Sequence, residues 1–164
     1  EYHDLLKDDP EYREKALRFS RLTVDITELL VDLPFRAPAK PLPRKITYQD
    51  PCHLAHAQRI TRAPRTILTS IPGVELLEME NSSLCCGGAG IYSTVQPELS
   101  GRLLRRKMES IAQTGAEEVV TANPGCMLQI EQGMRARGAK GRGEKVRHVV
   151  DILDEAYQLE EKGG

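Results

Sequence analysis

The sequence predicts an α/β fold, in which about four parallel strands form a Rossmann-like sheet flanked by helices, preceded by a leading N-terminal helix. The main observation is that short predicted strands alternate with longer segments of helical periodicity from Lys45 onward. A second observation is a proline-rich stretch that separates this alternation from the first helical segment. Strands that alternate with helices are joined by right-handed crossovers, and the sheet is then parallel.

The first predicted element is a helix over residues 11–33, where apolar side chains recur at helical spacing until Pro34 ends the pattern. Residues 34–44 contain four prolines and predict a stiff, extended connector. The strands that follow are predicted over residues 45–49, 74–79, 117–121 and 145–150. Further helices are predicted over residues 53–70, 97–113, 126–137 and 151–161.

The chain has 164 residues, which suits a single domain made of a leading helix and connector (1–44) and an α/β core (45–161). Its 23 basic and 24 acidic residues give no reason to expect binding to nucleic acid. No apolar run is long enough to cross a bilayer, and no secretory signal opens the chain. Because the sequence starts at Glu1 within a polar turn, we expect it to be a segment of a longer protein.

The four cysteines all follow predicted strands. Cys52 follows the strand at 45–49, Cys85 and Cys86 follow the strand at 74–79, and Cys126 follows the strand at 117–121. The carboxyl ends of parallel strands lie at one edge of a sheet, which is also where such sheets bind ligands. We therefore expect the four thiols to converge. In a chain without a secretory signal, metal or catalytic roles outrank disulfides, and a shared metal site is the favoured interpretation.

The residues around the cysteines suit thiolates. Gly87 and Gly88 would let the backbone approach an inorganic core and donate N–H groups to it. Each cysteine loop leads toward a predicted helix, whose free N–H groups lower a thiol pKa. His53 could donate a hydrogen bond to a sulfide, replace a thiolate or move a proton, although it could also simply pack within its loop.

Other interpretations remain open at this point, including a structural zinc or metal-free interaction module and a redox thiol enzyme in which Cys85 or Cys86 attacks a disulfide. A single buried cysteine is commonly just a small apolar core residue, but none of the four lies in a predicted strand or in the middle of a predicted helix. Four thiolates can also bind a structural zinc ion. Neither the paired Cys-x-x-Cys spacing of zinc sites nor that of cluster sites is present. Spacing alone therefore does not decide between zinc and an iron–sulfur cluster.

Other polar residues near the cysteines have ordinary structural interpretations. Asp50 is predicted to cap the helix that follows it, Asn123 to shape the turn before Cys126, and His56 to pack within a loop. A basic group on the predicted helix at 97–113 is interpreted mainly as a solvated face, with docking to an acidic partner as the lesser alternative. Its members are Arg102, Arg105, Arg106 and Lys107.

Three motifs together resemble the cysteine-rich, or CCG, domain family. They are Asp-Pro-Cys-His-Leu at 50–54, Cys-Cys-Gly-Gly-Ala-Gly at 85–90 and Asn-Pro-Gly-Cys at 123–126. The family occurs in heterodisulfide reductase B subunits, lactate-utilisation proteins and glycolate oxidase iron–sulfur subunits, and the opening segment looks most like the glycolate oxidase type. The fullest form of the family pattern ends in Cys-x-x-Cys, whereas Gln129 stands at that last position here.

The resemblance implies an electron-transfer domain that is not catalytic by itself. Cys52, Cys85, Cys86 and Cys126 would hold a [4Fe–4S] cluster, which an isolated fragment can lose, whereas a five-thiolate non-cubane cluster is disfavoured. The longer protein would contain an N-terminal ferredoxin-like domain and a first cysteine-rich domain. Its partner would be a flavin-bearing subunit that oxidises glycolate to glyoxylate. The expected location is the cytoplasm, either free or at the surface of the inner membrane.

Overall fold

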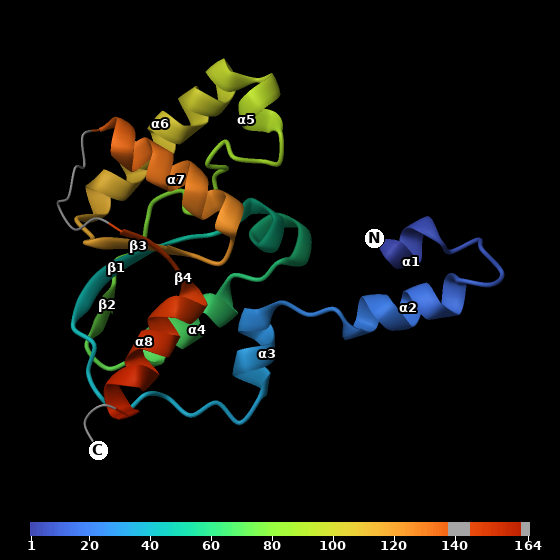
Figure 1. The fold of residues 1–164 in the computed structure, drawn as a ribbon, viewed down its shortest axis with the longest axis horizontal. Coiled ribbons are helices and arrows are strands. Elements are labelled where there is room, and N and C mark those ends of the chain that lie inside the picture. Colours follow the sequence, from blue (N-terminus) through green and yellow to red (C-terminus); the bar gives the residue numbers. More distant parts are fainter. Residues whose placement is uncertain (138–144, 162–164) are drawn as a thin grey trace. The chain divides into compact units, whose positions relative to one another are not determined.

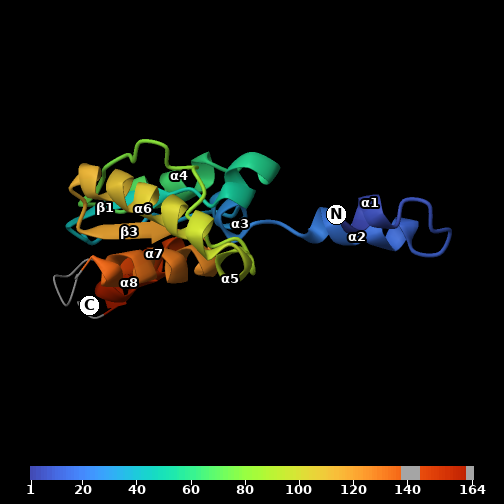
Figure 2. The ribbon, with the colours of Figure 1, turned by 90° about the horizontal axis from the view of Figure 1, so that it is seen from above.

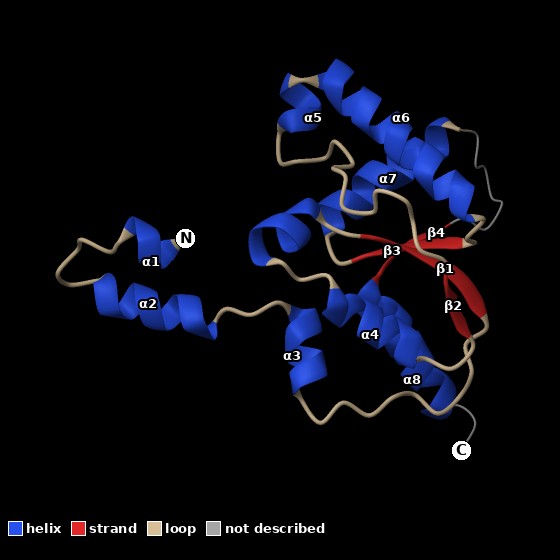
Figure 3. Ribbon diagram, turned by 180° about the vertical axis from the view of Figure 1, so that it is seen from behind, coloured by secondary structure: helices blue, strands red, loops and turns tan. Residues whose placement is uncertain are grey.

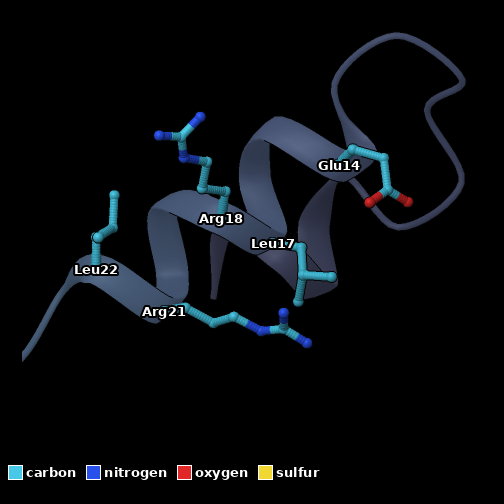
Figure 4. A pocket seen from close by; sticks show the side chains of 5 residues that line it. All are labelled: Glu14, Leu17, Arg18, Arg21 and Leu22. Atoms are coloured by element: carbon cyan, nitrogen blue, oxygen red, sulfur yellow. The ribbon is translucent and has the colours of Figure 1, made fainter.

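The computed structural model describes residues 1–137 and 145–161, and it divides the chain into two compact units. The first unit, Glu1–Phe35, contains three helices, α1 (Tyr2–Leu5), α2 (Arg13–Leu22) and α3 (Ile26–Asp32). Within it the rings of Tyr2 and Phe19 meet edge to face, with centroids 5.3 Å apart. An open groove of about 420 Å³ runs along α2 (Figure 4). Its lining residues are Glu14, Leu17, Arg18, Arg21 and Leu22.

The prediction of one helix over residues 11–33 was wrong, because the helix is interrupted between α2 and α3. Thr23 adopts an extended conformation, and its hydroxyl donates to the Phe19 carbonyl, which ends α2. Asp25 then caps α3, since its carboxylate accepts a hydrogen bond of 2.9 Å from the Thr27 N–H. The apolar periodicity continues across this break, so periodicity alone could not reveal it.

The second unit begins at Arg36 and contains the sheet. Its strands are β1 (Arg44–Gln49), β2 (Val74–Leu76), β3 (Glu118–Thr121) and β4 (Lys145–His148). All are parallel, in the order β2-β1-β3-β4. Figure 2 shows β1 and β3 side by side between helices. Ile46, Tyr48 and Val120 are fully buried in these central strands, as expected for a parallel sheet that is covered on both faces.

Helices cover both faces of this sheet (Figures 1 and 3). One face carries α5 (Tyr92–Val95), α6 (Pro97–Thr114) and α7 (Pro124–Ala136), and the other carries α4 (Arg62–Ser70) and α8 (Val149–Glu161). The predicted α/β fold with its four-stranded parallel sheet and N-terminal helix is therefore confirmed. No helix among residues 1–137 and 145–161 combines the length and the apolar character that a bilayer crossing needs.

The helix predicted over residues 53–70 is two helices. His53–Gln58 forms a short π-helix, Arg59 adopts a left-handed conformation with φ +59°, and α4 starts at Arg62. Two predicted strands were too long, since β2 ends at Leu76 and α8 begins directly after β4.

The proline-rich segment that leads into β1 is attached to the second unit. Leu42 donates its backbone N–H to the Pro72 carbonyl at 2.8 Å. The Tyr157 hydroxyl donates to the Arg36 carbonyl at 2.6 Å, and the Arg36 guanidinium pairs with Glu160 at the same distance. The segment therefore follows α8 before the chain enters the sheet.

Candidate metal centre

The order of the strands brings the three cysteine-bearing segments together. The strands β2, β1 and β3 are neighbours in the sheet, and each is followed by one of the segments. The chain first leaves β1 toward β2 and later returns to the other side of β1 to form β3. The direction of winding therefore changes between β1 and β3, and the crevice at such a change is where open α/β sheets place ligands. Cys52 follows β1 and Cys126 follows β3, so the two cysteines lie at the ends of the strands on either side of this change.

The four thiols form two interacting pairs at this edge. The Cys52 side chain acts on the pKa of Cys85, and the Cys86 and Cys126 side chains act on the pKa values of each other. The pairs also lie close enough for Cys52 and Cys85 to act electrostatically on Cys126. All four cysteines are free thiols. Side chains that are distant in the sequence are thus gathered at one site.

The two pairs differ in burial. Cys86 and Cys126, which we call the inner pair, are only 3% and 8% exposed. They pack in a core cluster that is rich in sulfur, since it also contains Met79, Met108 and Met134. Cys52 and Cys85, which we call the outer pair, are half-buried. The site therefore has one side in the core and one side nearer to solvent.

The inner pair shares one proton unequally. The hydrogen bond that Cys126 donates lowers the pKa of Cys86, and the backbone N–H of Gly88 adds to this effect. The same bond raises the pKa of Cys126, with burial acting in the same direction. In the outer pair, burial raises the pKa of Cys85, although the Gly87 N–H donates to its sulfur at 3.3 Å. Within the inner pair, Cys86 is therefore the thiol that ionises more readily.

The four thiols can be compared with the ligand sets of a zinc ion and of an iron–sulfur cluster. In the described part of the chain, no three His, Cys, Asp or Glu side chains are arranged around a single metal-ion position. A structural zinc ion needs four ligands around one point, with sulfurs at about 2.3 Å. An iron–sulfur cluster instead takes its thiolates on several iron atoms. Four soft sulfur donors at one edge of the sheet are the ligand type that such a cluster takes.

The loop of Cys85 and Cys86 is held against α6 by close backbone contacts. Gly87 has φ +90°, and a Cβ atom placed on it would lie 2.6 Å from the Ser100 carbonyl oxygen. The Ser100 hydroxyl donates to the Gly87 carbonyl at 2.9 Å and accepts from the Gln129 amide at 3.1 Å. Gln129 also lies against Gly88. The residue at the position of a fifth family thiol thus supports the loop, a role that the sequence did not reveal.

Lys107 lies beneath the segment that leads to this loop. Its side chain is fully buried, and its Nζ donates to the carbonyls of Asn81 at 3.0 Å and Ser82 at 2.8 Å. The prediction of a solvated basic face was therefore wrong for Lys107, whereas the neighbouring arginines are exposed. The helical spacing carried a signal, because Lys107 shares a helix face with Leu104 and Ile111.

The turn of Cys52 is held by an ion pair. The Arg65 guanidinium on α4 donates to both carboxylate oxygens of Asp50, at 2.8 and 2.9 Å, and also contacts Glu78. Arg65 further stacks over the Tyr48 ring, 5.1 Å from its centroid. These bonds raise the pKa of Arg65. The predicted capping role of Asp50 was therefore wrong, because its carboxylate pairs with α4.

The turns of Cys52 and Cys126 are linked by two side chains. Asn123 caps α7, since its Oδ1 accepts from the Cys126 N–H at 2.9 Å, and this confirms the turn-shaping role predicted for it. Its Nδ2 lies 2.9 Å from the Nε2 of His53, which is exposed. His56 contacts the Ser83 carbonyl at 3.2 Å, which agrees with the loop-packing interpretation.

Comparisons with known proteins agree with this site. A family model described as a cysteine-rich domain (CCG) matches residues 46–131, a range that includes all four cysteines. The chain is 44% identical, over 95% of its length, to a "Probable glycolate oxidase iron-sulfur subunit" of Bacillus subtilis (strain 168). It is 34% identical over 98% of its length to the "Glycolate oxidase iron-sulfur subunit" of Escherichia coli (strain K12).

A third relative, "Lactate utilization protein A" of Oceanobacillus iheyensis, is 30% identical over 94% of the chain, which spans 62% of that protein. The chain spans only 35% and 37% of the two glycolate oxidase subunits. The likeness therefore concerns one part of those longer proteins. The family match and the alignments show that the chain belongs to the cysteine-rich (CCG) domain family, and the position of the four thiols agrees with this.

Proposed function

We propose that this domain carries electrons through a [4Fe–4S] cluster held by Cys52, Cys85, Cys86 and Cys126. The observation that supports the proposal most directly is the pairing of four free thiols at the carboxyl edge of the sheet. Such a cluster, when bound, accepts and releases one electron at a time. The relatives whose names include an iron–sulfur subunit support the same cofactor class.

The surrounding residues have defined tasks in this proposal. The N–H groups of Gly87 and Gly88 already point at the sulfurs of Cys85 and Cys86 and would stabilise their thiolate forms. His53, through Asn123, would keep the turns of Cys52 and Cys126 in register. The core side chains beneath the inner pair exclude water, which also affects the reduction potential of such a centre.

We infer that the longer protein relays electrons from a flavin-bearing subunit that oxidises glycolate to glyoxylate, in the cytoplasm or at the surface of the inner membrane. The ferredoxin-like domain and first cysteine-rich domain expected from the family would complete the relay. The 44% identity to a probable glycolate oxidase subunit favours glycolate. The lactate-utilisation relatives make lactate the second candidate. Reduction of the assembled complex by glycolate, but not by lactate, would decide between them.

The test of the cofactor is an anaerobic purification with iron, acid-labile sulfide and zinc analysis and EPR after reduction. We expect a brown protein with close to four irons and four sulfides per chain, as a [4Fe–4S] cluster requires. Replacing any of the four cysteines by serine should lower the iron content. The control Gln129→Ala should keep it, because the amide is a loop support and not a ligand.

Two results would contradict the proposal. A colourless protein with one zinc ion per chain would show that the thiols serve a structural ion. Full iron content and an unchanged EPR signal in Cys126→Ser would show that the ligand set is wrong.

A further inference from the structure

Lys107 on α6 is a buried cation that forms no salt bridge with a carboxylate in the part of the chain that the structure describes. Lys107 is fully buried, and in residues 1–137 and 145–161 no carboxylate lies within salt-bridge distance of its Nζ. Asp50 acts on it from a distance but is already held by Arg65. Burying an ammonium group without a counter-charge is costly. The position therefore calls for a negative charge from another source.

The thiol site lies within electrostatic reach of Lys107, and a bound cluster would bring the negative charge there. The groups that act electrostatically on Lys107 are, besides Asp50, Cys86, Cys126 and Cys85, and of these Cys86 acts most strongly. These cysteines lie in the loop after β2 and on α7. Burial lowers the pKa of Lys107, and the sulfurs oppose that shift. A cluster held by thiolates carries net negative charge, which makes this interaction stronger when the cofactor is present.

The ammonium group of Lys107 also holds the chain segment that leads to the inner pair. Nζ donates to the Asn81 and Ser82 carbonyls, in the segment between β2 and Cys85. It also lies 3.9 Å from the sulfur of Met79 in the core cluster. The charge thus cannot move away from the site, in contrast to the exposed Arg102, Arg105 and Arg106, whose fields are screened by solvent.

We propose that Lys107 is a positioning residue whose buried positive charge compensates the thiolate-bound cluster and raises its reduction potential. This inference rests on the proposed cluster at Cys52, Cys85, Cys86 and Cys126. A nearby cation stabilises the reduced form, which carries one more negative charge, relative to the oxidised form. Lys107 sets both the electrostatics of the site and the path of the loop that reaches it.

Three variants separate charge from shape. Lys107→Gln removes the charge but keeps an N–H donor for the Asn81 and Ser82 carbonyls. Lys107→Arg keeps the charge. Lys45→Gln is the matched control, because Lys45 is half-exposed at the start of β1, where it pairs with Glu75 at 3.6 Å. Each protein is purified anaerobically, and its iron content, thermal unfolding and midpoint potential are measured.

We expect Lys107→Gln to lower the equilibrium constant for reduction about tenfold. For a one-electron couple this lowers the midpoint potential by ~59 mV. Lys107→Arg and Lys45→Gln should stay near the wild type. If Lys107→Gln loses iron, retention of iron by Lys107→Arg supports the compensating role of the charge.

Equal potentials in Lys107→Gln and the wild type would overturn the inference, as would equal shifts or equal iron loss in Lys107→Gln and Lys107→Arg. An iron-free wild type would instead overturn the proposed function itself. The iron content of the wild type therefore separates the two failures.

Discussion

The inner and outer thiol pairs occupy one site but are held there by different forces. Cys86 and Cys126 belong to the apolar core and pack among methionine and aliphatic side chains. Cys52 and Cys85 lie nearer to solvent, and the turn of Cys52 is fixed by the Arg65–Asp50 ion pair. Packing is non-directional and shared by many atoms, whereas an ion pair depends on two groups. The inner pair should therefore be a part of the folded core, and the outer pair an attachment to it.

The largest expected effect is that of removing the ion pair on the outer side. Arg65→Met leaves Asp50, whose side chain is only 4% exposed, as an unpaired buried carboxylate. We expect a loss of about 3–5 kcal/mol of unfolding free energy, measured by urea denaturation. The exposed Arg62→Met on the same helix is the control, with a change within about 0.5 kcal/mol. Equal stability of the two variants would show that the turn does not depend on the pair.

A substitution beside the inner pair should come next. Gly87→Ala combines φ +90° with a Cβ position 2.6 Å from the Ser100 carbonyl oxygen, so the loop must move. We expect a loss of about 3 kcal/mol from backbone strain and overpacking, together with a lower iron content. Gly90→Ala shares a positive φ but has open space around it, and it should cost only about 1 kcal/mol. Similar melting temperatures would argue against the close approach.

A serine scan compares the two pairs directly in the metal-free protein. Cys126→Ser places a hydroxyl in an apolar core position and should cost about 1–3 kcal/mol. Cys52→Ser, in the half-buried position, should stay within about 0.5 kcal/mol. Denaturation of both variants under chelating, reducing conditions measures the difference. Equal costs would remove the distinction between core and attachment.

The smallest expected effect is a change in the stability of the metal-free protein with pH, caused by the proton that Cys86 and Cys126 share. The Cys126 hydrogen bond lowers the pKa of Cys86 from 9.0 to about 6. A lowered pKa in the folded state contributes stability that is complete above the unfolded value and is lost as the pH falls toward the folded value. The metal-free protein should thus gain stability from about pH 6 to pH 9. Above that range the raised pKa of Cys126 acts in the opposite sense, so the stability should pass a maximum.

Urea titrations across this range test the proton linkage. Cys126→Ala removes the donor to Cys86 and should flatten the rise in stability with pH. Ultraviolet absorbance of the thiolate should show the same change, because the pKa of Cys86 moves back toward the ordinary value. An unchanged slope in Cys126→Ala would mean that the inner thiols do not share a proton.

Much of the architecture follows from local patterns in the sequence. The four strands were predicted because short segments alternate with helical segments, and the structure places all four in a parallel sheet. The position of Cys52 after β1 and of Cys126 after β3 needed no further information, since parallel strands end at the same edge. The family motifs then indicated an iron–sulfur site.

Other features depend on contacts that no local pattern encodes. The interruption after Thr23 and the π-helix at His53–Gln58 lie within continuous helical periodicity, and single backbone conformations decide them. Asp50 was assigned to a cap because its partner Arg65 lies on another element. Lys107 was predicted to lie on a solvated face because it is charged, whereas tertiary packing buries its side chain. Side-chain partners across elements are therefore what the sequence left undetermined.

The order of the strands has a consequence for how the centre is made in the cell. β3 pairs with β1, so that Glu118 lies opposite Ile46, although β2 is synthesised between them. A ribosome therefore releases Cys52, Cys85 and Cys86 well before Cys126 and the strand that positions it. Nascent chains that end before Cys126 therefore lack one of the four sulfurs. If the four thiols hold a cluster, as proposed, the cluster can be completed only after Cys126 has been synthesised, and the three earlier thiols must stay reduced until then.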